Sequence, residues 1–178
     1  MLVSAMRTKF FLALLFWFYI LPLIAYADGN AADVVIHFQS QSSISFTANQ
    51  SSFQITLPDY QQGTASEALE ISYSIMANDV GRLEDLVLVR LMAEFDGIAL
   101  EARMGGFADH GGTAHLTASS SDFRALSTAD LGLANKAVDS GDGRMIDGDL
   151  TLLYRAKALK DLEAGRHDNT LIVSFADN

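Results

Sequence analysis

Hydrophobic and polar residues alternate along most of the chain that follows residue 30. Every second side chain is apolar in residues 52–57, 68–76, 98–104, 150–157 and 170–175. Because alternate side chains of a strand point to opposite faces, this pattern predicts β-strands with one buried face. Residues 86–91 (LVLVRL) are instead apolar on nearly both sides, which is typical of a central strand covered on both faces.

Two connecting segments have signals of their own. Asp96-Gly97 separates the apolar run that ends at Phe95 from the alternating residues 98–104, and this dipeptide predicts a two-residue hairpin turn. Residues 123–138 are the only stretch with a helical pattern, and Gly132 interrupts it, so we expect one or two helical turns or an irregular crossover. About eight short strands separated by turns predict an all-β, immunoglobulin-like β-sandwich, with a closed barrel as the alternative.

The N-terminal segment has the pattern of a targeting signal. The first nine residues carry two basic residues and no acidic one, and residues 10–27 are apolar almost without interruption. The segment ends on Ala25-Tyr26-Ala27, with small residues at the two positions that a signal peptidase reads. We therefore interpret residues 1–27 as a signal peptide of an exported protein. An uncleaved anchor is the alternative, since the apolar run is about long enough to span a bilayer.

Composition and motifs exclude several classes of function. The chain has no cysteine, which excludes a disulfide scaffold, thiol catalysis and cysteine-ligated zinc. Its formal net charge of −10 argues against a nucleic-acid partner, which needs clustered Lys and Arg. There is no G-x-S-x-G or H-E-x-x-H motif and no set of residues that fills the roles of an active site. We therefore expect neither catalysis nor a cofactor.

Two polar segments are candidates for a ligand site. Residues 105–115 are rich in glycine and contain His110 and His115, but their spacing is not that of a helical metal site, and we interpret the segment as a solvated loop. Residues 139–149 carry four aspartates, and calcium prefers such oxygen ligands: Asp139, Asp142, Asp147 and Asp149. The order of these residues does not fit an EF-hand loop, so a polar connection between strands explains them equally well.

The segment after the signal peptide has an arm-like composition. Residues 28–33 are small and polar, and Val34, Ile36 and Phe38 then alternate with other residues before a second polar stretch. One interpretation is an ordinary first strand of the same sandwich. The other is a strand that is donated to the open sheet edge of a neighbouring subunit.

The C-terminal residues carry a resemblance to a known family. Residues 159–178 (LKDLEAGRHDNTLIVSFADN) contain a leucine, a short Ala-Gly turn and an alternating final strand. This pattern resembles the closing segment of subunits of chaperone–usher fimbriae and of the related capsule-like surface fibres of Gram-negative bacteria. Residues 71–81 loosely resemble a strand and turn of the same proteins. His167 stands where the family usually has tyrosine.

The resemblance implies an immunoglobulin-like sandwich that lacks its last strand. Residues 28–42 would be the flexible arm with the donor strand, and residues 43–178 the sandwich domain. Val34, Ile36 and Phe38 would be the donor residues, and Leu171, Val173 and Phe175 would line the acceptor groove. The partners implied are a periplasmic chaperone, an outer-membrane usher and identical or related subunits. The chain would pass through the periplasm to the cell surface.

We therefore expect a secreted structural subunit of a fimbria or capsule-like fibre that assembles by exchange of donor strands. Adhesion through a host receptor is a further role that the family suggests. The alternative is a monomeric periplasmic or secreted β-sandwich that binds a ligand or Ca²⁺ through residues 105–115 or 139–149. The sequence leaves open whether the first strand pairs within its own chain.

Overall fold

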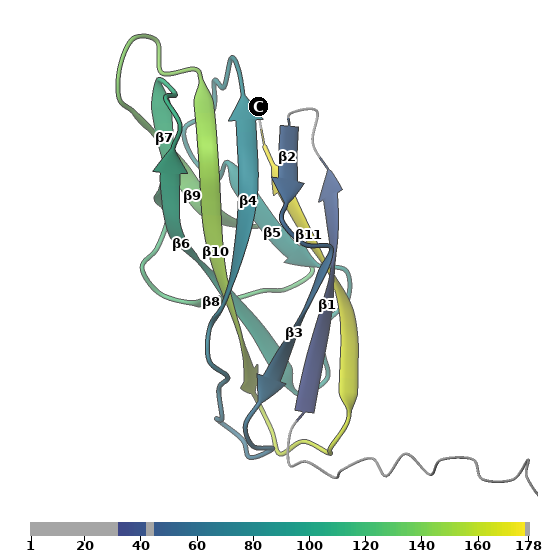
Figure 1. Cartoon of the computed structure of the whole chain (residues 1–178). Coiled ribbons are helices and arrows are strands. Elements are labelled where there is room, and N and C mark those ends of the chain that lie inside the picture. The colour runs from purple at the N-terminus through teal and green to yellow at the C-terminus, as the bar shows by residue number, and fades with distance from the viewer. Residues whose placement is uncertain (1–31, 42–44, 177–178) are drawn as a thin grey trace, which may run out of the picture.

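The protein is a two-layered β-sandwich. The computed structural model describes residues 32–41 and 45–176, and these residues contain eleven strands and no helix (Figure 1). The strands are β1 (Ala32–Gln41), β2 (Ser45–Ala48), β3 (Ser52–Leu57), β4 (Leu69–Ala77), β5 (Val87–Leu91), β6 (Ile98–Asp109), β7 (Ala114–Ala118), β8 (Arg124–Ala125), β9 (Leu131–Val138), β10 (Ile146–Ala158) and β11 (Arg166–Phe175). The interpretation of residues 1–27 as a signal peptide lies outside the described residues.

The strands form two sheets that face each other. One sheet has six strands in the order β3-β1-β11-β5-β9-β7, and the other has five in the order β2-β4-β10-β6-β8. In the orientation of Figure 1, the upper end carries residues 78–86, 110–113 and 139–145, and the lower end carries residues 58–68, 92–97 and 159–165.

The alternating segments form the predicted strands. In β3 and β4 the apolar positions are buried and the intervening ones are mostly exposed, as period-two alternation requires. The apolar segment 86–91 supplies β5, which lies inside its sheet between β11 and β9. The prediction of a β-sandwich is confirmed. β5 is a central strand as predicted, but only one of its faces is fully buried, since Leu88 and Arg90 on the other face are half-buried.

The core between the sheets contains a pair of buried tyrosines. Tyr73 and Tyr154 lie on the adjacent strands β4 and β10, and their hydroxyl oxygens are 2.9 Å apart. The ring of Tyr73 stacks on Phe46, and that of Tyr154 stacks on Phe53 of the opposite sheet, each with centroids 5.2 Å apart. Burial raises the pKa of both hydroxyls because the phenolate would lose its hydration.

This tyrosine pair predicts a loss of stability in alkaline solution. A tyrosine with a raised pKa in the folded state stabilises the fold below about pH 10, and that stability is lost above it because the unfolded chain ionises first. We expect the free energy of unfolding to fall by about 2 kcal/mol for the two groups between pH 10 and pH 11. Urea unfolding at a series of pH values measures this loss. The double variant Tyr73→Phe/Tyr154→Phe should lack most of it, and an equal loss in that variant would contradict the assignment.

The segment with the helical pattern contains no helix, so the prediction of helical turns was wrong, whereas residues 126–130 form an irregular crossover between the two sheets. Residues 131–138 form β9, which pairs with β5 and β7, and β8 covers only Arg124–Ala125. Leu133 and Ala134 are buried in the core. Pairing with a strand on each side satisfies the backbone of β9, and this tertiary context overrides a weak local preference for helix.

Asp96-Gly97 does not form a hairpin between paired strands. It links β5 of one sheet to β6 of the other, so the two flanking strands are not partners. Gly97 has a φ of +78°, but among the described residues Asp96 does not share this conformation, which a type I′ turn requires at both positions. The Gly97 carbonyl accepts a hydrogen bond from the Leu159 backbone, and Asp96 accepts one from Lys160. The turn is therefore hydrogen-bonded to the residues that follow β10, and not to a hairpin partner.

Candidate functional site

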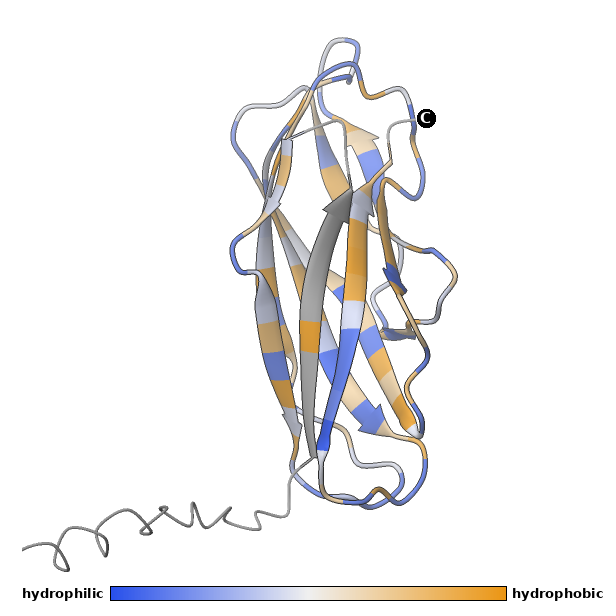
Figure 2. Ribbon diagram, turned by 90° about the vertical axis from the view of Figure 1, so that its right-hand side faces the viewer, coloured by the Kyte–Doolittle hydropathy of each residue, from blue (hydrophilic) through white to orange (hydrophobic). Residues whose placement is uncertain are grey.

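The N-terminal strand β1 lies inside a sheet and is the main candidate for function. It runs parallel to β11 over nine residue pairs, from Asp33–Arg166 to Gln41–Ser174. On its other side it runs antiparallel to β3 over six pairs, from Ala32–Leu57 to His37–Ser52. Figure 2 looks onto this part of the six-stranded sheet. The first strand therefore pairs within its own chain, which the sequence left open.

The structure brings the predicted donor and acceptor residues together. Ile36 is 0% exposed and belongs to the same hydrophobic core as the predicted groove residues Leu171, Val173 and Phe175 of β11, all of which are buried. In the backbone register, Val34 lies beside His167 and Phe38 beside Leu171. The open groove that the resemblance implied is occupied here by the chain's own strand.

The other wall of this groove was not assigned from the sequence. Phe53, Ile55 and Leu57 of β3 are buried and face the same core. Their alternation identified them as a strand, but nothing in the sequence places that strand beside β1 rather than elsewhere. The register supplies this information, since Ile36 lies opposite Phe53.

The position of β1 makes the sandwich dependent on it. β3 and β11 are neighbours of β1 and not of each other, so removal of β1 leaves two sheet edges separated by one strand. At the usual spacing of about 4.8 Å between strands, that gap is about 10 Å wide. Its edges would be unpaired, and the inward side chains of β3 and β11 would face water. Such a gap is a template for another extended segment.

The lower end of the β1–β11 pair contains a buried polar side-chain atom. His167 lies beside Val34 in the register, and its Nε2 atom is buried and has no hydrogen-bond partner among the described residues. A buried polar atom without a partner destabilises the fold. The pair is also parallel, an arrangement that is slightly less stable per residue than antiparallel pairing. The parallel arrangement lowers the stability that β1 gains from β11.

The glycine-rich segment 105–115 is mostly part of two strands and not a solvated loop. β6 extends to Asp109 and β7 begins at Ala114, which leaves residues 110–113 as the turn. The Nδ1 atom of His115 lies 2.7 Å from a carboxylate oxygen of Asp139, and His110 Nε2 lies 3.4 Å from Asp149. Pairing with adjacent strands extends the segment despite its glycines.

Three of the four aspartates of residues 139–149 engage separate partners: Asp139 contacts His115, and Asp142 and Asp149 have partners of their own. Asp147 and Asp149 belong to β10, and Asp149 accepts a hydrogen bond from Ser74. Asp142 accepts one from the backbone of Arg144. Within residues 32–41 and 45–176, no three His, Asp or Glu side chains lie together in a way that would hold a metal ion. The calcium site considered from the sequence therefore has no assembled ligand set in these residues.

Comparisons with known proteins do not assign this chain to a family. No protein-family model matches it, and a search of curated proteins finds no match. In the part of the chain that the structure describes, no helix has the length and apolar character needed to cross a membrane.

Proposed function

We propose that this chain is an exported structural subunit that polymerises into a bacterial surface fibre by exchanging β1 between copies. The observation that supports this function most is the place of β1, a terminal strand that fills the gap between β3 and β11. A periplasmic chaperone would occupy this gap before assembly, and an outer-membrane usher would deliver the subunits. The strand of a neighbouring copy would then take the place of the chain's own β1.

The direction of an exchanged strand follows from the sheet. Because β1 is parallel to β11 and antiparallel to β3, any strand in this gap is parallel to one neighbour and antiparallel to the other. The chain's own β1 makes six antiparallel residue pairs with β3 and nine parallel residue pairs with β11, so its longer pairing is the parallel one. A strand donated by a second copy is connected to the β2 of that copy and not to the β2 of the acceptor, so the acceptor's connection does not fix its direction. The exchanged complex would be more stable if this strand ran antiparallel to β11, because the longer pairing would then be antiparallel, the slightly more stable arrangement per residue.

Cross-linking of introduced cysteines tests the exchange and its direction, and the absence of native cysteine makes the experiment clean. Within one chain Gln41 lies beside Ser174. In a reversed strand that keeps Ile36 facing the core opposite Leu171, Gln41 lies beside Arg166. We expect oxidised Gln41→Cys/Arg166→Cys to form a ladder of covalent oligomers, and Gln41→Cys/Ser174→Cys to form a closed monomer that assembles only after reduction.

The second candidate function is a monomeric binding module, and the pairing of β1 within its own chain favours it. Such a protein would keep β1 permanently and would use a loop surface for its ligand. Under this alternative, Gln41→Cys/Arg166→Cys stays monomeric at every protein concentration after oxidation. If, in addition, the unaltered chain stays monomeric at every protein concentration, the two results would contradict the fibre proposal.

A further inference from the structure

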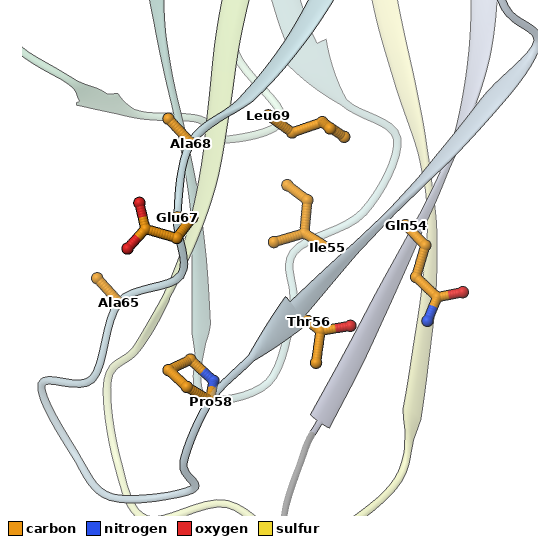
Figure 3. A pocket seen from close by; sticks show the side chains of 8 residues that line it. All are labelled: Gln54, Ile55, Thr56, Pro58, Ala65, Glu67, Ala68 and Leu69. Atoms are coloured by element: carbon orange, nitrogen blue, oxygen red, sulfur yellow. The ribbon is translucent and has the colours of Figure 1, made fainter.

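An open groove of about 310 Å³ lies at the lower end, between β3 and the segment that leads into β4 (Figure 3). Ile55, which is 4% exposed, and the half-buried Leu69 form its apolar floor. The full lining consists of Gln54, Ile55, Thr56, Pro58, Ala65, Glu67, Ala68 and Leu69. In the described part of the chain, no strand pairs with the outer side of β3, so the groove lies at a sheet edge.

The groove has one charged group. Glu67 is exposed at its rim, and its carboxylate forms no ion pair within the described residues. The rest of the lining is apolar or uncharged. A complementary partner would therefore offer an apolar side chain next to a positive charge.

The upper end of the same molecule carries such a pair. Leu83 is 57% exposed and follows Arg82 in the connection between β4 and β5. The connection is held in place because the Val80 backbone donates to the Arg144 carbonyl at 2.9 Å and the Lys136 backbone donates to the Leu83 carbonyl at 2.7 Å. Arg82 donates through Nε to the Glu84 carbonyl at 2.6 Å and forms no ion pair in the described chain. Leu83 is thus an apolar residue that a fixed loop presents to solvent.

Strand exchange would bring these two ends together, so the inference rests on the proposed function. If a neighbour's β1 runs antiparallel to β11, its Gln41 lies at the lower end of the acceptor. Four residues later, Ser45 begins β2 at the upper end of the neighbour, and four residues span at most about 14 Å. Ser45 pairs with Met76, the last residue but one of β4, the strand that leads into the connection carrying Arg82 and Leu83. The neighbour's upper end must therefore approach the acceptor's lower end.

We propose that successive copies make a second, head-to-tail contact in which Leu83 of one copy enters the groove of the next and Arg82 pairs with Glu67. The two surfaces differ, so each copy can use one of them toward each neighbour, and the contact repeats along a fibre. It fixes the orientation of neighbouring sandwiches, which the exchanged strand alone does not.

A charge exchange tests this contact in the full-length mature chain. Glu67→Arg and Arg82→Glu each place like charges against each other and should slow the growth of oligomers by about tenfold. The combined variant Glu67→Arg/Arg82→Glu restores opposite charges at every contact and should grow at nearly the original rate. Leu83→Ser should also slow growth, whereas Met76→Ser, which removes an equally exposed (57%) apolar side chain, should not.

Each charge variant also carries Gln41→Cys/Arg166→Cys, and the rate at which its ladder of covalent oligomers forms is measured over time. A ladder that forms equally fast in all the charge variants would overturn the head-to-tail contact and leave strand exchange intact. Equal slowing in both single variants and the combined variant would also overturn it, since that result indicates local damage and not pairing. Absence of the ladder in the otherwise unaltered chain would contradict the exchange itself, and with it this contact.

Discussion

Replacement of Ile36 by aspartate is expected to destabilise the folded chain and to stop its assembly. Ile36 is fully buried between β3 and β11, where a carboxylate would lose its hydration without gaining a partner. An uncompensated buried charge costs about 3–5 kcal/mol, a large part of the 5–15 kcal/mol that holds a typical domain together. The same cost applies whether the strand belongs to the chain or to a neighbour. Urea unfolding and size-exclusion chromatography measure the two effects.

Ser52→Asp is the matched control for this substitution. Ser52 is an exposed residue of the adjacent strand β3, so it adds the same charge at the surface. We expect its unfolding midpoint and its oligomers to match those of the unaltered chain. If Ile36→Asp behaved like this control, β1 would not occupy the gap in either form, and the proposed function would fail.

Deletion of residues 28–41 from the mature chain is expected to have an equally large effect. The truncated chain keeps β3 and β11 but loses the strand between them, so the inner faces of both strands become accessible. Unpaired edges with apolar side chains promote aggregation. We expect the protein to be insoluble when it is expressed alone and to recover solubility when a peptide of residues 28–41 is added during refolding.

The peptide also provides the control for the deletion. A peptide of the same length with Ile36→Asp should not rescue, because it offers the same backbone but a charged side chain at the buried position. Rescue is measured as soluble monomer and as protection from proteolysis. A truncated chain that is soluble and stable without any peptide would show that the gap closes by itself and would contradict a role for β1 as a separable strand.

The sequence predicted the strands well but not their partners. The alternation in residues 52–57, 68–76 and 98–104 identified β3, β4 and part of β6, because burial of one face depends only on local spacing. Assignment to a sheet depends on contacts between distant residues. Asp96-Gly97 illustrates the difference, since it has the local signal of a hairpin and yet connects two sheets. Likewise, β9 has a helical local pattern and is extended because β5 and β7 bond to it on both sides.

For the candidate site, too, the sequence predicted the strands but not how they pair. Alternation identified Val34, Ile36 and Phe38 as a strand and Leu171, Val173 and Phe175 as another. It could not indicate that the two strands are parallel neighbours or that β3 forms the second wall. Both depend on the register of the folded chain. The groove beside Glu67 and the exposed Leu83 had no sequence signal, because each is defined by what surrounds it in space.

The short connection between β1 and β2 has a consequence for where fibres would form. Only residues 42–44 separate the two strands, so a detached β1 stays next to its own gap at an effective concentration of millimolar order. A copy in dilute solution therefore recaptures its own strand faster than it meets another copy. In the proposed function, polymerisation would therefore be fast only where subunits are crowded or handed over one at a time. In dilute solution exchange would be slow, and the disulfide of Gln41→Cys/Arg166→Cys would retain each exchanged strand as it forms, so the tether would limit growth away from the place of assembly.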